Sequence, residues 1–177
     1  MNWDAVGALA EIIGALGVLV TLIYLATQIR DNTRSLQAAS LQSVLEGPRD
    51  RYFLPMAQSD DMADIYARGL SSLDLLDARE KRRFFFMMYE QLFQMQQVWQ
   101  LRERDLIPQV DYDAWLEYTI SLTRTPGGAE MWPICRSVIT PTIADVIDEG
   151  LRRYADRPSF IEHVPLFDES RGDRDEP

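Results

Sequence analysis

The sequence predicts an all-α protein: one N-terminal transmembrane helix continues into a juxtamembrane helix, and a small cytoplasmic helical bundle follows. Three observations predict this class. Residues 5–26 form a largely apolar run in which Glu11 is the only charge. Further along the chain, apolar residues recur at spacings of three and four, most clearly from Phe85 to Trp99. No stretch of useful length alternates apolar and polar residues as a half-buried strand does.

Composition limits the functional class before any motif is considered. The chain has 177 residues, of which 46% are hydrophobic, and this is enough for one domain with a core. Its formal net charge of −10 argues against nucleic-acid binding, because a phosphate backbone requires a basic surface. The single cysteine, Cys135, excludes an intrachain disulfide, so nothing indicates an oxidising compartment.

The apolar segment is long enough to cross a bilayer. At about 1.5 Å per residue, residues 5–26 span roughly 33 Å, against a hydrocarbon core of about 30 Å. Trp3 and Tyr24 flank it where amphipathic rings favour the interface. A cleaved signal peptide fits poorly, since no Lys or Arg precedes the run and the run is too long. A buried core helix remains the other alternative.

Small residues form a stripe along this segment. They recur at intervals of three and four, which places them on one helix face: Gly7, Ala10, Gly14, Gly17 and Thr21. In lipid no hydrophobic force drives helices together, and close backbone approach along small residues is the usual basis of pairing. The stripe therefore predicts association with another helix, most simply with a second copy. The alternative is that glycine is merely common in membrane helices.

Glu11 lies about 60° around the helix from Gly14, roughly two turns inside the span. A charge at the bilayer centre costs about 2.5–3.5 kcal/mol on insertion scales, and less toward the edge. Three interpretations stay open. Glu11 is protonated and hydrogen-bonded across a helix interface, or it reaches the outer headgroups, or it lines an ion or proton path.

A known signature covers the same region. The strings W-D-A-V-G-A-L-A-E-I-I-G-A (3–15) and V-T-L-I-Y-L-A-T-Q-I-R-D-N-T-R (20–34), with Gln42, carry it. This part of the chain resembles a widespread group of uncharacterised bacterial single-span membrane proteins that begin W-[DE]-A-[IV]-G-A-x-x-E-[IV]-[IV]-G-A and continue Y-L-A-x-Q-I-R-x-N-T. The resemblance implies a membrane-anchored helical protein and attaches no activity or cofactor to the motif.

A polar motif marks the point where the predicted helix leaves the bilayer. Its residues are Gln28, Arg30, Asn32, Thr33 and Arg34. Such side chains can meet lipid headgroups or a neighbouring subunit, and the alternative is a simple stop-transfer collar. Because Arg30 and Arg34 follow the span and no basic residue precedes it, we expect the N-terminus outside and the C-terminal domain in the cytoplasm. The expected location is the bacterial inner membrane.

The remaining elements follow from turn and capping residues. Without Gly or Pro over 18–46, the first helix should run on to Gly47-Pro48. We expect a short helix or loop around Pro55, a helix over 60–69 that stops at Gly69, and the longest soluble helix over 75–105, capped by Asp74 or Asp77. Asp111 should open a helix to Thr123, with Asp111 and Asp113 as capping carboxylates. Pro126-Gly127-Gly128 is predicted to form a turn. We expect a short helix over 129–136 after it and a last helix from Thr140-Pro141 to about Tyr154.

The longest soluble helix has the composition of a central bundle helix. Its core candidates are Phe85, Met88, Leu92, Met95 and Trp99, and the apolar face is widened by Phe84, Phe86, Tyr89 and Phe93. A solvated polar side is expected from Glu90, Gln91, Gln94, Gln96, Gln97 and Gln100, with a polar partner surface as the alternative.

The sequence gives no constellation typical of an enzyme. The only histidine, His163, and Cys135 stand in neighbourhoods unlike a nucleophile pair, and no metal-ligand spacing occurs. We therefore expect no catalytic, metal or cofactor site. The predicted parts are an anchor (1–30), a juxtamembrane helix (31–50), a bundle (51–155) and an acidic tail (156–177), disordered after Phe167.

The expected function is a self-associating scaffold or regulatory subunit whose partners are the bilayer, a second copy or another membrane protein, and not nucleic acid. A homo-oligomeric channel with Glu11 lining the pore is the alternative.

Overall fold

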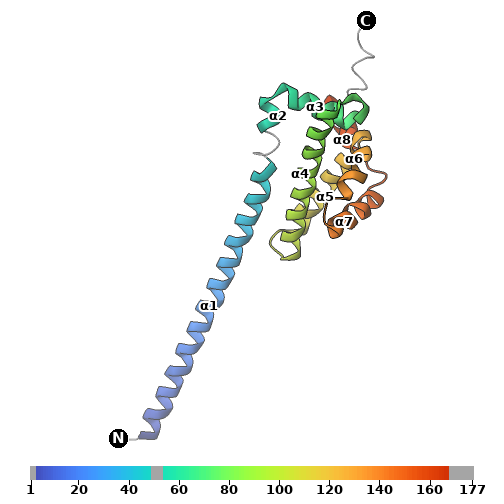
Figure 1. Ribbon diagram of the computed structural model, residues 1–177. Helices are drawn as coiled ribbons and strands as arrows, with labels where there is room; N and C mark the ends of the chain where they lie inside the picture. The colour runs from blue at the N-terminus through green and yellow to red at the C-terminus, as the bar shows by residue number, and fades with distance from the viewer. Residues whose placement is uncertain (1–2, 49–53, 168–177) are drawn as a thin grey trace. The chain divides into compact units, whose positions relative to one another are not determined.

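The computed structural model describes residues 3–48 and 54–167 and is all-α over those ranges, which confirms the predicted fold class (Figure 1). The α-helices are α1 (Trp3–Pro48), α2 (Leu54–Gln58), α3 (Asp60–Ser71), α4 (Ala78–Glu103), α5 (Gln109–Thr123), α6 (Pro126–Arg136), α7 (Pro141–Arg153) and α8 (Phe160–His163). Two short 3-10 turns are η2 (Leu73–Leu75) and η3 (Pro165–Phe167). The chain divides into two compact units, Met1–Ser40 and Leu41–Pro177.

Over residues 3–40 the first unit is a single uninterrupted helix. Helix α1 ends at Pro48, so the expected continuation of the apolar helix to Gly47-Pro48 is confirmed. No break separates the predicted anchor from the predicted juxtamembrane helix. The last turns of α1, from Leu41 onward, belong to the second unit.

The second unit is built around α4, which packs against α3, α5, α6 and α7 (Figure 1). Asp77 is the N-cap of α4 and forms a capping box with Glu80, so of the two candidate caps the structure selects Asp77. Fully buried apolar side chains from several helices meet at α4: Ile65, Leu70, Phe84, Leu92, Met95, Val98, Ile120, Leu122, Ile143 and Ile147.

The predicted orientation of α4 is wrong in part. Phe86 and Phe93 are 66% and 41% exposed, although they were expected to widen the core face. Gln91 and Gln94 are buried, although they were expected on the solvated side. The physical reason is that each amide has a partner: Gln91 Nε2 donates to Thr119 Oγ1 (3.3 Å), and Gln94 Nε2 donates to the carbonyl of Val44 (3.3 Å).

The Gln94 contact replaces a backbone hydrogen bond that Pro48 cannot make. In a regular helix the Val44 carbonyl accepts from the amide of residue 48, but Pro48 has no N–H. Val44 is buried, so its carbonyl would otherwise lack both a helical partner and water. Gln94 supplies the missing donor, which attaches the end of α1 to α4.

Two glycine assignments are corrected. Gly69 does not stop α3, which continues to Ser71 with Ser72 as its C-cap. The Pro126-Gly127-Gly128 segment is not a turn; it is the first turn of α6, with Thr125 as N-cap and Pro126 at the start. Both glycines lie where two backbones nearly touch, because a Cβ on Gly127 would lie 1.7 Å from the Gly69 carbonyl oxygen.

The start of α5 also differs from expectation. The helix begins at Gln109, directly after Pro108, and no side chain caps it. Asp111 lies in the first turn, and Asp113 accepts a hydrogen bond from Gln109 Nε2 (2.9 Å) instead of capping. Pro108 occupies the N-cap position, which places Asp111 inside the first turn, where its charge favours the positive end of the helix dipole.

The segment assigned to the tail is folded over its first part. Helix α8 and η3 pack against α5 and α3, and Phe167 stands edge-on to Tyr66, with ring centroids 6.1 Å apart. Ser71 Oγ donates to the Phe167 carbonyl (3.3 Å). Folded structure therefore extends to Phe167. The disorder expected beyond that residue lies outside the described residues.

Candidate functional site

The apolar part of α1 is exposed on every side. The candidate membrane span covers Gly7–Gln42. Its most apolar 18 residues have a mean hydropathy of 2.2, and none of them is buried. Large apolar side chains are about half exposed or more all around the helix: Leu9, Ile12, Ile13, Leu16, Val18, Leu19, Val20, Leu22, Ile23 and Leu25. A helix that is apolar all round belongs in an apolar medium. Helix α1 is thus long and apolar enough to span a membrane.

The predicted small-residue face is open within the chain. A Cβ built on Gly7, Gly14 or Gly17 would meet nothing within 4 Å. Thr21 Oγ1 donates to the Gly17 carbonyl of its own helix (2.8 Å), so its hydroxyl needs no outside acceptor. Ala10 belongs to α1, but its side chain lies outside the described residues. The described part of the face therefore consists of three open glycines and Thr21, whose hydroxyl is already bonded.

Glu11 lies beside this face and is exposed. Within the described residues its carboxylate has neither a hydrogen bond nor an ion pair. The described residues therefore do not compensate for the only charge in residues 5–26.

The polar motif at the end of the span makes mostly local contacts. Gln28 Nε2 donates to the Tyr24 hydroxyl (3.1 Å), and Thr33 Oγ1 donates to the Ile29 carbonyl (2.9 Å). Arg34 lies 3.9 Å from Asp31 in an exposed pair. Arg30 and Asn32 are also exposed. The structure does not gather these residues into a cluster; they surround the helix as a polar band.

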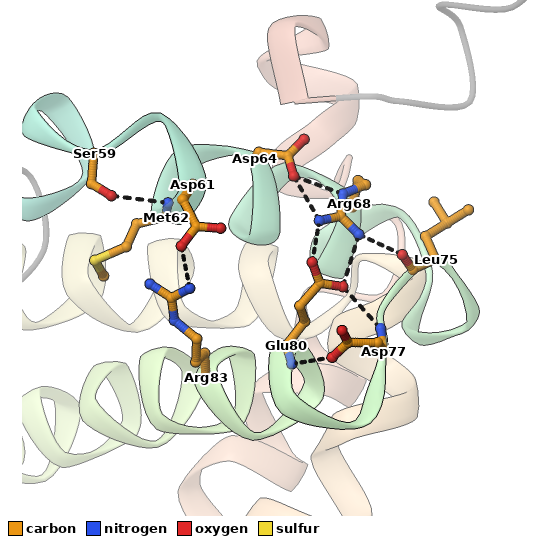
Figure 2. Close-up of polar contacts among 9 residues, drawn as sticks. All are labelled: Ser59, Asp61, Met62, Asp64, Arg68, Leu75, Asp77, Glu80 and Arg83. Atoms are coloured by element: carbon orange, nitrogen blue, oxygen red, sulfur yellow. Dashed lines mark hydrogen bonds and ion pairs between the residues drawn. The ribbon is translucent and has the colours of Figure 1, made fainter.

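In the second unit a group of polar contacts centres on Arg68 (Figure 2). Its guanidinium binds both oxygens of Glu80 (2.7 and 3.1 Å), donates to Asp64 Oδ2 (2.6 and 2.9 Å) and donates to the Leu75 carbonyl (2.5 Å). These contacts connect α3, η2 and the start of α4.

Hydrogen bonds to Glu80 and Asp64 raise the pKa of Arg68. The hydrogen bonds from Arg68 and, second in size, from the Asp77 backbone amide lower the pKa of Glu80 to about 2. Arg83 pairs with Asp61 alongside. The five N–H donors of Arg68 each face an acceptor, so this arginine holds α3, η2 and α4 together.

The residues considered for nucleophilic chemistry are separate in the fold. Cys135 lies in α6 and is 1% exposed, whereas His163 lies in α8 and is exposed. Burial raises the pKa of the Cys135 thiol to about 11, so the thiol is protonated at neutral pH. Over the described residues, no group of three or more His, Cys, Asp or Glu side chains is arranged to hold a metal ion.

One pocket was not anticipated from the sequence. It has a volume of about 370 Å³ and lies between α5, the end of α7 and α8. Its lining includes Tyr118, Arg124, Arg157, Phe160 and His163. The sequence signal was weak, because these residues come from separate segments and their convergence depends on how α8 folds back on α5.

In comparisons with known proteins, no family model, no curated protein and no solved structure matches the chain. The resemblance of residues 3–42 to bacterial single-span proteins therefore stays a prediction.

Proposed function

We propose that this protein is anchored in the bacterial inner membrane by α1 and self-associates through the small-residue face of that helix. The bundle would lie in the cytoplasm, as the basic residues after the span predict, and the assembly would act as a scaffold or regulatory subunit. The observation that carries the proposal is the combination in α1 of full apolar exposure with an unfilled glycine face.

The argument for pairing is one of shape. Bulky side chains cover the rest of α1, and acyl chains pack against them as well as another helix would. Along Gly7, Gly14 and Gly17 the backbone is bare, so a second helix can approach closely and gain dispersion contacts that flexible lipid tails fill less well. Each glycine also costs roughly 1 kcal/mol of helix propensity relative to alanine. A helix–helix contact offsets that cost.

Pairing in the membrane would bring two bundles together. Helix α1 is continuous to Pro48, and its end is held to α4 by Val44 and Gln94. An oligomer assembled through α1 therefore presents bundles in a fixed number, which is the property required of a scaffold.

The test is disulfide crosslinking of the intact protein in native membranes, in a Cys135→Ser background. We expect Gly14→Cys to crosslink efficiently and Leu16→Cys, about 160° around the helix, to do so weakly. In gentle detergent, Gly14→Leu should dissociate the oligomer into monomers. Leu16→Phe, which enlarges a side chain on the opposite side of the helix, should leave the oligomer intact. Equal crosslinking at both positions, or an oligomer that survives Gly14→Leu, would contradict the proposed interface. Recovery of the intact protein in the aqueous fraction after lysis would contradict the anchor.

The alternative function is a homo-oligomeric ion or proton channel. The observation that favours it is the Glu11 carboxylate, which has no partner within the described residues and lies beside the proposed interface. Reconstituted protein should then conduct protons or cations in liposomes, and Glu11→Gln should change the flux. Tight liposomes with an intact oligomer would favour the scaffold.

A further inference from the structure

We propose that the pocket between α5, α7 and α8 binds a small amphipathic carboxylate, with its acid group on Arg124 and Arg157 and its apolar body on the Tyr118 and Phe160 rings. The proposal concerns the bundle alone and does not depend on how α1 assembles.

The pocket has the size and composition of a small-molecule site. Its volume of about 370 Å³ falls within the range of about 300–1,000 Å³ typical of ligand pockets. Tyr118 and Phe160 meet edge to face, with centroids 6.0 Å apart and planes at 78°. Ile120 and Val164 extend this apolar lining. Such a surface favours an apolar ligand body by burial and ring contacts.

The lining of the pocket is net positive, whereas the whole chain is net negative. Its lining holds two arginines, Arg124 and Arg157, against one carboxylate, Glu117, in a protein of net charge −10. A second pocket, between α5 and α7, shows the opposite balance: its lining includes Asp113, Asp145 and Glu149 beside Arg153. The two pockets share helix α5 but differ in the sign of the charge on their lining, and only the first suits an anion.

Arg124 is oriented but not saturated. Its Nη1 donates to the Tyr154 carbonyl at the end of α7 (2.9 Å), which fixes the guanidinium at the pocket. A guanidinium carries five N–H donors, so further donors remain for a carboxylate, which it can bind in bidentate fashion.

Two carboxylates near the pocket, Glu117 and Glu162, interact with these arginines without a close hydrogen bond. Arg157 lies 3.7 Å from Glu117, a loose pair with side chains 66% and 45% exposed, and such pairs contribute little. Glu162, next to His163, is engaged at the start of α8 by the amide and hydroxyl of Ser159 (2.6 and 2.7 Å). A ligand carboxylate can therefore take over the contacts of Arg157 without leaving a buried charge behind.

A carboxylate on an apolar body has two natural sources, an aqueous aromatic acid and a fatty acid released from the bilayer. The probes are 2-naphthoate for the first and octanoate for the second, with 2-naphthylmethanol and octanol as uncharged matches. Binding is measured by titration calorimetry on the full chain in phosphatidylcholine nanodiscs, with empty nanodiscs as the blank.

We expect at least one carboxylate to bind saturably at one site per chain, and its alcohol to bind at least about tenfold more weakly. The better carboxylate identifies the source. Arg124→Gln and Arg157→Gln should each weaken binding about tenfold or more. Arg152→Gln makes the same charge change on α7 outside the pocket and should leave affinity unchanged.

Arg157 is exposed, so its variant is expected to fold even if loss of the Arg124 contact disturbs the end of α7. If neither 2-naphthoate nor octanoate binds saturably, the proposal is overturned. Equal affinity for acid and alcohol, or an equal loss in Arg152→Gln, would overturn it as well.

Discussion

Replacement of Gly127 by alanine tests the closest helix crossing in the bundle. The added Cβ would lie 1.7 Å from the Gly69 carbonyl oxygen and 2.9 Å from the Gly69 carbonyl carbon, both of them backbone atoms. Since an ordinary contact needs about 3.4 Å or more, α3 and α6 would have to separate by well over 1 Å. That movement would also open the packing of Phe84, whose ring already lies against Gly69.

The expected magnitude follows from two opposing effects. Overpacking of a rigid core contact costs about 1–3 kcal/mol and more where backbone must move. Alanine regains at most about 1 kcal/mol of helix propensity over glycine. We therefore expect Gly127→Ala to lower the free energy of unfolding by about 2 kcal/mol or more.

The assay is denaturant unfolding of the full chain in detergent, followed by the near-ultraviolet circular dichroism of the bundle aromatics. Two alanine variants calibrate it. Gly150→Ala meets the flexible end of Ile120 (2.6 Å) and should cost less, and Gly17→Ala meets nothing within 4 Å and should leave bundle stability unchanged. A Gly127→Ala variant that unfolds within about 0.5 kcal/mol of the parent would refute the reasoning about this crossing.

Three further predictions concern local contacts. Asp105 has φ 52° at the end of α4, so Asp105→Gly should raise stability by about 1 kcal/mol in denaturant unfolding, because glycine adopts this conformation without strain. Gln94→Leu leaves the Val44 carbonyl unpaired and should cost about 1–3 kcal/mol; the cost should shrink in a Pro48→Ala background, where residue 48 regains an N–H, and an unchanged cost in that double-mutant cycle would contradict the assignment. The folded-state pKa of Glu80 is about 2, below its ordinary 4.5, so its stabilising effect is complete above about pH 4.5 and is lost as pH falls toward 2; the thermal midpoint of Glu80→Gln should therefore fall less steeply across that window.

The sequence predicted the helices well because their signals are local. Prolines and caps mark the starts of α4, α6 and α7 within a few residues, and the continuous helix to Pro48 follows from the absence of breakers. The misassignments arose where a residue has two uses. Gly69 and Gly127 look like stop and turn signals, but they serve a close crossing between helices that are distant in sequence. No local pattern distinguishes these uses.

The side of α4 that faces the core depended on tertiary partners in the same way. Gln91 and Gln94 are polar and were expected in water, yet each is buried because Thr119 or Val44 offers an acceptor. Phe86 was expected inside and is exposed, because periodicity alone leaves the angular position of the packed face uncertain by about a residue. The cationic pocket could not be predicted for a related reason: Arg124, Arg157 and His163 come together only after α8 returns to α5.

The glycines of the two units differ in one physical respect, and this difference is the best support for a helix partner. In the second unit, a Cβ on Gly47, Gly69, Gly127, Gly128 or Gly150 would come within 3.0 Å of another part of the same unit. Glycine is there because something else fills the space. In the first unit, Gly7, Gly14 and Gly17 meet nothing within 4 Å, although each weakens an isolated helix by roughly 1 kcal/mol. If the same rule holds along α1, the space beside Gly7, Gly14 and Gly17 is filled by a molecule other than this chain, and Gly14→Ala should weaken the oligomer while it stabilises the separated helix.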